Sequence, residues 1–177
     1  MTPWVLLDSA PVPGKGGELQ LYRRGGEFSI KIAGRGELMS SRVHGSEEAL
    51  AEQTCARLAD RSQPSVLIGG LGMGFTLAAA LSQLGERALV TVAELVPAVV
   101  AWNRGALGEP AGYPLRDPRV SVREGDVARL LEAGQQSYDA ILLDVDNGPE
   151  GLTRKQNDWL YGENGLSAAF TALRPRG

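Results

Sequence analysis

Glycines and acidic residues follow four predicted strands of this chain, and their types suit the binding of a nucleoside. The first group is the run Gly69-Gly70-Leu71-Gly72-Met73-Gly74, between a short apolar strand and an apolar helix. Glycines permit a tight turn and let a ligand approach the backbone near a helix N-terminus. The G-x-G-x-G spacing differs from G-x-G-x-x-G and so disfavours a dinucleotide fingerprint. Gly70, Gly72 and Gly74 are candidate ligand-binding residues; the alternative is a turn that only joins the strand tightly to the helix.

Single acidic residues follow the second and third predicted strands. Glu94 stands twenty residues beyond Gly74, where a carboxylate can accept hydrogen bonds from two ribose hydroxyls. The alternative for Glu94 is a solvated strand end. Asp126, in Gly125-Asp126-Val127, can accept a hydrogen bond from an adenine amino group or cap the helix that follows. The sequence leaves both roles of Asp126 open.

A pair of carboxylates follows the fourth predicted strand, in Asp144-Val145-Asp146-Asn147-Gly148-Pro149. Asp144 and Asp146 are candidates for binding an amine or for removing a proton from one. The alternative is a plain Asx-turn. Trp159 and Tyr161 are expected in the loop beyond this turn, either as a lid over substrate or as anchors of the loop.

Strands that alternate with helices are expected to position these groups. Apolar segments predict strands at 65–68, 88–93, 120–123 and 138–143, and helices at 75–84, from Pro97 onward and at 127–133. Near-continuous apolar strands alternating with helices indicate a parallel sheet that is covered on both faces. Ligands bind outside the carboxyl ends of the strands in such sheets. The glycine turn and the acidic residues should therefore meet at one edge.

The N-terminal part of the chain has a different pattern. Residues 19–22 and 28–32 alternate apolar and polar side chains, with Gly25-Gly26 as a hairpin signal between them, and residues 38–40 predict a third strand. A helix over 47–59, capped by Ser46, follows. We therefore expect a small antiparallel β region over 1–45 and an α/β core over 46–177.

Composition narrows the class of protein. Of 177 residues, 43% are hydrophobic and 22% are charged, and the net charge is −3. This balance suits a globular chain and gives no overall basic field for nucleic acid or an anionic membrane. The longest apolar stretches reach only about ten residues, too short for a membrane span. Single cysteine and histidine residues predict neither a disulfide framework nor a metal site, and the cytoplasm is the expected compartment.

Taken together, these motifs resemble the S-adenosylmethionine-dependent methyltransferase fold and, more closely, the spermidine/spermine synthase family of aminopropyltransferases. The resemblance covers most of the chain. It implies an α/β, Rossmann-like class I methyltransferase fold with parallel strands in the order 3-2-1-4 and a small N-terminal antiparallel region. Its motifs are Val66-Leu67-Ile68-Gly69-Gly70, Ala93-Glu94-Leu95-Val96-Pro97, Glu124-Gly125-Asp126-Val127 and Tyr138-Asp139-Ala140-Ile141-Leu142-Leu143-Asp144.

The resemblance also implies an activity. Glu94 would bind the ribose and Asp126 the adenine of a decarboxylated S-adenosylmethionine, and Asp144 would stand at the position of the family's catalytic aspartate. The reaction would move an aminopropyl group to an amine of a polyamine, so the expected partners are a small cationic amine and a second copy of the chain in a homodimer.

Two departures from the family pattern leave alternatives. Gly72 stands where the family has an aspartate that attracts the donor's terminal ammonium, and glycine does not repel the carboxylate of ordinary S-adenosylmethionine. A methyltransferase using that donor is therefore the first alternative. Ser46-Glu47-Glu48 stands where the family has Tyr-His-Glu. The second alternative is a non-catalytic relative that binds nucleosides or forms dimers.

The length raises one further expectation. In the family, a proline–glycine turn like Arg174-Pro175-Arg176-Gly177 directly precedes the fifth strand of the sheet. The apolar edge of the fourth strand would need a cover. We expect that C-terminal strands of the fold are missing from this sequence.

Overall fold

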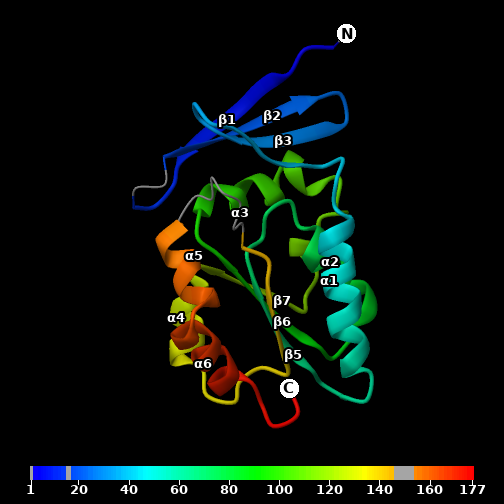
Figure 1. The fold of residues 1–177 in the computed structure, drawn as a ribbon. Helices are drawn as coiled ribbons and strands as arrows, with labels where there is room; N and C mark the ends of the chain where they lie inside the picture. Colours follow the sequence, from blue (N-terminus) through cyan, green and yellow to red (C-terminus); the bar gives the residue numbers. More distant parts are fainter. Residues whose placement is uncertain (1, 15–16, 146–153) are drawn as a thin grey trace.

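The structure is a computed structural model that describes residues 2–14, 17–145 and 154–177. Its strands form two sheets. The antiparallel sheet has the order β1-β2-β3-β4 and consists of β1 (Val5–Pro11), β2 (Glu18–Arg24), β3 (Glu27–Ile32) and β4 (Gly36–Ser40). The parallel sheet has the order β7-β6-β5-β8 and consists of β5 (Ser65–Gly69), β6 (Leu89–Glu94), β7 (Val120–Glu124) and β8 (Ala140–Leu143). Figure 1 shows the antiparallel sheet lying across one end of the α/β core.

The parallel sheet confirms the fold class and the strand order 3-2-1-4 predicted from the sequence. Its central strand, β5, pairs with β6 on one side and β8 on the other, so that Val66 lies opposite both Val90 and Ala140. The apolar side chains of β5 are fully buried, as expected for a strand that is covered on both faces. All four strands point the same way, so their carboxyl ends meet at the edge beneath the antiparallel sheet.

Helices cover both faces of the parallel sheet. They are α1 (Gly45–Cys55), α2 (Phe75–Gln83), α3 (Pro97–Arg104), α4 (Val127–Ala133), α5 (Arg154–Tyr161) and α6 (Glu163–Ala172), with short 3-10 helices at Ala56–Leu58, Ala106–Gly108 and Pro114–Arg116. In Figure 1, α1 and α2 lie on one side of the sheet and α4, α5 and α6 on the other. Pro97 begins α3 as predicted, because its fixed φ and missing N–H suit the first turn of a helix.

Three local predictions were wrong. The helix α1 begins at Gly45 after His44, and the Ser46 hydroxyl donates to Glu47 Oε2 (2.6 Å) instead of capping the backbone. Trp159 and Tyr161 lie on α5 rather than in a loop. The antiparallel sheet has a fourth strand, β1, whose side chains are mostly exposed on both faces, so its sequence has no alternating pattern.

A single cluster of buried apolar side chains joins the antiparallel sheet to the core. It includes Phe28 and Ile30 of β3 as well as Val92 of β6 and Val99 of α3. The indole N–H of Trp102, on α3, also donates to Asp8 Oδ2 of β1 (2.7 Å). The antiparallel sheet therefore packs firmly over the carboxyl ends of the parallel strands.

A buried ion-pair cluster lies at the opposite end of the parallel sheet, before β5 and β8 begin. The Asp139 carboxylate is 2% exposed and accepts from Arg61 (2.7 Å), Arg174 (2.9 Å) and the Ser65 N–H (2.7 Å). Arg61 also donates to the Arg176 carbonyl (2.8 Å), so the cluster joins three separate segments of the chain. Because a buried carboxylate needs such partners, this cluster has a structural explanation that does not involve a ligand.

Candidate functional site

A cavity lies between the carboxyl ends of the parallel strands and the antiparallel sheet. Five of the residues predicted from the sequence line it, namely Gly70, Gly72, Glu94, Asp126 and Asp144. They lie at or directly after the ends of β5, β6, β7 and β8, so the structure brings all four predicted strand ends to one place. Asp146 lies outside the described residues.

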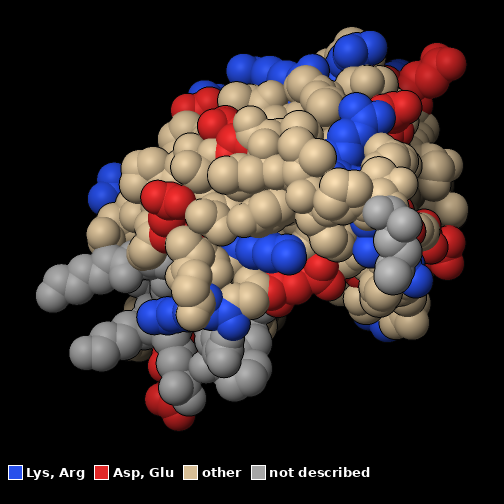
Figure 2. All heavy atoms as spheres, turned by 90° about the horizontal axis from the view of Figure 1, so that it is seen from above, with Lys and Arg blue, Asp and Glu red and all other residues tan. Residues whose placement is uncertain are grey.

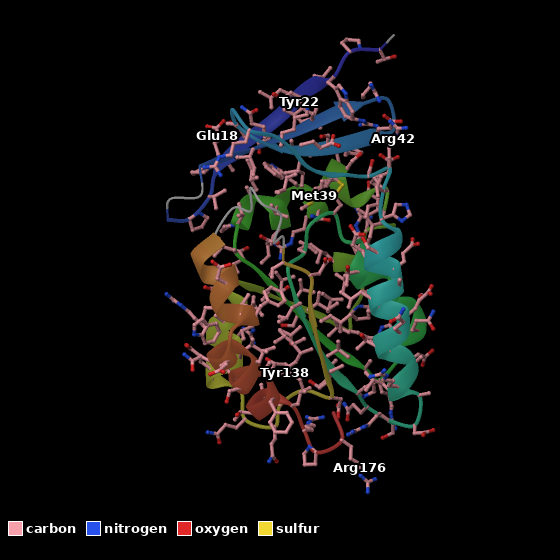
Figure 3. All side chains as sticks on the ribbon, in the orientation of Figure 1. Glu18, Tyr22, Met39, Arg42, Tyr138 and Arg176 are labelled. Atoms are coloured by element: carbon pink, nitrogen blue, oxygen red, sulfur yellow. The ribbon has the colours of Figure 1, made fainter. Side chains whose placement is uncertain are left out.

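The antiparallel sheet supplies a wall of this cavity that sequence reasoning missed. Leu19 of β2, Ile30 of β3, and Leu38 and Met39 of β4 line the cavity from above. Figure 3 shows Met39 between the antiparallel sheet and the core. No local signal identifies these side chains as part of a site, because only the docking of one sheet over the other brings them there.

The glycine turn adopts a backbone that other residues rarely adopt. Gly70 and Gly72 have φ values of +94° and +53°. A Cβ atom on Gly70 would collide with the carbonyl oxygen of Asp144, so the turn and the segment after β8 touch through their backbones. Gly74, with φ +85°, precedes α2 and is not among the residues that line the cavity; a Cβ there would lie 3.1 Å from Asn103 Oδ1. Gly74 thus contributes to the packing of the turn.

The Glu94 carboxylate is buried, with only 8% of the residue exposed, and is held by backbone donors. The N–H of Leu71 donates to its Oε2 (2.9 Å) and the N–H of Val96 to its Oε1 (2.9 Å). Burial raises the pKa of Glu94 above its ordinary value of 4.5, although the backbone N–H groups around it act in the opposite direction. The N–H groups of Gly72 and Leu95 are also among those that lower this pKa, so four backbone donors surround the carboxylate.

Asp126 caps α4 and lines the cavity as well. The Ala128 N–H donates to Asp126 Oδ1 (2.9 Å), which is the capping role that the sequence left open. This cap uses one carboxylate oxygen and leaves the second for a ligand amino group. The N–H of Gly125 bonds to the Glu94 carbonyl (2.7 Å), so the ends of β6 and β7 are held together at this point.

Asp144 is half-buried at the end of β8, and its side chain has a fixed direction. The hydroxyl of Thr76, on α2, donates to Asp144 Oδ2 (2.5 Å), and the Asp144 N–H bonds to the Gly69 carbonyl (2.8 Å). These bonds hold the carboxylate beside the glycine turn. Its position suits both the binding of a cation and the acceptance of a proton.

A second cavity adjoins the first and has some of the same walls. Five residues line both cavities: Leu38, Met39, Gly72, Asp144 and Val145. The second cavity is otherwise lined by Ser40, Ser46, Glu47, Leu71, Met73 and Phe75. It therefore combines apolar walls with two carboxylates, an arrangement that suits an aliphatic cation.

The described residues contain neither a candidate metal centre nor a candidate membrane-spanning helix. Among them, no group of three His, Cys, Asp or Glu side chains could hold a metal ion. Nor is any helix in the described ranges long and apolar enough to cross a membrane. The face seen in Figure 2 has acidic and basic side chains interspersed.

Comparison with known proteins finds similar solved structures. The spermidine synthase from Thermotoga maritima aligns with 96% of this chain at a TM-score of 0.74 and 18% identity, over 54% of its own length. A spermidine synthase in complex with the transition state analogue AdoDATO gives a TM-score of 0.73 and 18% identity, over 96% of this chain and 53% of its own. A probable spermidine synthase from Corynebacterium glutamicum ATCC 13032 gives 0.62 and 16%, over 97% and 60%.

These similarities confirm the fold predicted from the sequence, a parallel methyltransferase-like core with an antiparallel N-terminal sheet. The chain spans 53 to 60% of the length of the structures it matches. No family model and no curated protein matches the sequence.

Proposed function

We propose that the protein transfers an aminopropyl group from decarboxylated S-adenosylmethionine to an amine of a small polyamine. The observation that carries this proposal is the place of Asp144, which lines both of two adjoining cavities at the strand ends. An aminopropyl group that moves from a donor in the first cavity to an acceptor in the second would move close to this carboxylate. The structural similarity to spermidine synthases supports the same reaction.

The first cavity suits the nucleoside of the donor. Glu94 would accept hydrogen bonds from both ribose hydroxyls through its two oxygens, and the second oxygen of Asp126 would accept one from the adenine amino group. Gly72 would let the donor approach the backbone of the turn, where a side chain would obstruct it. Gly70 would let the turn lie against the backbone of Asp144. Gly74 would act indirectly, by keeping the turn in this conformation.

Asp144 would act on the acceptor amine. An aliphatic amine has a pKa of about 10 and is protonated at neutral pH, so it needs to lose a proton before its nitrogen can attack. Asp144 would attract the cation and take that proton. The nitrogen then forms a bond to the aminopropyl carbon that is attached to sulfur. The bond between this carbon and sulfur breaks, and its electron pair goes to sulfur. The sulfonium becomes the neutral thioether of methylthioadenosine.

The second cavity would hold the rest of the acceptor. Glu47 and Asp144 line it, together with apolar side chains such as Phe75 and Met39. Methylenes of a polyamine would contact the apolar walls, and its amines would bind the carboxylates. Asp146, which lies outside the described residues, is proposed to assist Asp144 in binding the cation.

A homodimer is also part of the proposal. Val5, Leu6 and Leu7 of β1 are 53%, 49% and 44% exposed, so this edge strand has apolar surface that a second copy could cover. Light scattering during size-exclusion chromatography would test it. A monomeric mass at micromolar concentration would contradict this part of the proposal.

Calorimetry with S-adenosylmethionine, decarboxylated S-adenosylmethionine and methylthioadenosine, followed by product analysis, tests the proposed function. We expect decarboxylated S-adenosylmethionine and methylthioadenosine to bind, and the former to yield an aminopropylated product with putrescine or spermidine. Asp144→Asn should retain donor binding and lose turnover. If none of the nucleosides binds or shifts the melting temperature at millimolar concentration, the proposal is wrong. If Asp144→Asn turns over at the wild-type rate, the role of Asp144 is wrong.

A methyltransferase is the second candidate, and one observation favours it. The position of a Cβ on Gly72 lies 3.4 Å from Met39 Sδ, so this part of the turn faces an apolar side chain and has no acidic group of its own to repel the carboxylate of S-adenosylmethionine. Competition between the two donors separates the candidates, because a strong preference for the carboxylated donor would support the methyltransferase. Binding without any turnover would support a non-catalytic relative.

A further inference from the structure

Asn103, on α3, is completely buried and bonds to the glycine turn. Its side-chain amide donates to the carbonyl of Gly72 (2.8 Å) and to that of Val99, one turn earlier on the same helix (2.9 Å). Both hydrogens of the amide nitrogen are thus used, which fixes the orientation of the group. No other asparagine among the side chains that the structure describes is buried.

The other atom of this amide, Asn103 Oδ1, has no hydrogen-bond partner among the described residues. It lies 3.1 Å from the position that a Cβ atom on Gly74 would take. Burial of an acceptor without a partner costs free energy, and a leucine, which has the same branching without polar atoms, would avoid that cost. The packing of a hydrophobic core therefore does not explain the choice of asparagine, whereas the bond to Gly72 does.

The helix that carries Asn103 also follows Glu94 directly. The N–H of Val96, just before α3, donates to Glu94, and the N–H of Leu71 in the turn donates to the other oxygen of the same carboxylate. Asn103 adds a second connection between the turn and this segment. The turn and the segment that carries Glu94 are therefore joined at two points beside the first cavity.

We propose that Asn103 is a positioning residue of the donor site, which fixes the path of the Gly70–Gly74 turn relative to Glu94. It does so by holding the carbonyl of Gly72 through its amide nitrogen, while Gly74 leaves room for its amide oxygen. Asn103 is not among the residues that line either cavity, so it acts through the turn and not on the ligand. The identity of the donor rests on the proposed function; the positioning of the turn does not.

Hydrogen exchange in the ligand-free protein tests the positioning directly. The Gly74 N–H bonds to the Leu71 carbonyl (2.8 Å), so its exchange rate reports whether the turn stays closed. In Asn103→Leu we expect this amide to exchange about five- to tenfold faster, the factor that corresponds to one lost hydrogen bond of typical strength. Amides of β5 and β8 should keep their protection. Asn103→Ala, which is smaller, serves as a second variant if Asn103→Leu does not fold.

Binding of methylthioadenosine provides the second measurement, with Asp139→Asn as the matched control. This control weakens a buried polar cluster at the opposite end of the sheet and should leave the affinity unchanged. The Asn103 variants should lose affinity by a similar five- to tenfold factor. Unchanged exchange at Gly74, or exchange that rises equally throughout the sheet, would overturn the proposal. If the turn opens selectively but the wild-type protein binds no nucleoside, the positioning role stands and the proposed function fails.

Discussion

Replacing Gly70 by alanine should damage both the stability and the site, for a reason that is visible in the backbone. Gly70 has φ +94°, and a Cβ there would overlap the carbonyl oxygen of Asp144 and lie 3.0 Å from its carbonyl carbon. These are backbone atoms, which cannot rotate away as a flexible side chain can. The segment after β8 would have to move, and the Asp144 carboxylate would move with it.

The expected loss of stability has two parts. A non-glycine residue in the left-handed region costs about 1–2 kcal/mol. Insertion of a methyl group into a packed contact costs about 1–3 kcal/mol more. Gly70→Ala should therefore lower the free energy of unfolding by about 2–5 kcal/mol, a large part of the 5–15 kcal/mol typical of a domain.

Gly34→Ala is the matched control, because Gly34 has φ +72° and open space where its Cβ would lie. It should lose only the conformational part, about 1–2 kcal/mol. Urea denaturation measures both variants, with the slope of the transition as a check that the unfolding mechanism is unchanged. If Gly70→Ala is as stable as Gly34→Ala, the contact between the turn and Asp144 does not exist in solution. We also expect Gly70→Ala, and not Gly34→Ala, to lose nucleoside binding.

Three further variants test other parts of the structure. Glu94→Gln should weaken nucleoside binding about 10- to 100-fold, since hydrogen bonds to a charged group are lost. Burial raises the pKa of Glu94 above 4.5, so calorimetry should show the affinity of the wild-type protein falling as the pH drops through that raised pKa. The variant should show no such step. Asp139→Ala should lower the unfolding free energy by about 3–5 kcal/mol, as removal of one partner from a buried ion pair does, without changing the affinity of the folded protein. Trp102→Phe should cost about 0.5–1.5 kcal/mol through the lost bond to Asp8, and an equal stability in urea would contradict that bond.

The parallel core could be predicted from the sequence because its signals are local. Val66, Leu67 and Ile68 form an apolar run of the length of a strand, and the glycines that follow predict the turn into α2. Acidic residues after the other strands then fall at the same edge, since parallel strands end together. Some boundaries moved by one or two residues: β6 is Leu89–Glu94 instead of 88–93, and β8 begins at Ala140 instead of residue 138.

Features that depend on distant contacts could not be predicted. The strand β1 lacks alternation, and its place is set by backbone pairing with β2 and by the bond from Trp102 to Asp8. The wall that Leu38 and Met39 form over the strand ends exists only after the two sheets dock. Asn103 reads in the sequence as an ordinary polar residue of a helix, and its bond to Gly72 spans 31 residues of chain.

Asp139 and Glu94, the two buried carboxylates of the core, differ in how the protein stabilises them. Asp139 is paired with two guanidinium groups, whereas no Lys or Arg side chain of the described residues forms a salt bridge with Glu94. Among the described residues, the groups that bond to Glu94 are backbone N–H groups, and burial raises its pKa. The folded protein therefore binds a proton there more readily than the unfolded chain does. The stability that this protonation gives is present below about pH 4.5 and is lost as the pH rises through the raised pKa. A ligand that donates two hydroxyl hydrogens to the carboxylate would offset this cost at neutral pH, so nucleoside binding should raise the melting temperature of the wild-type protein more than that of Glu94→Gln.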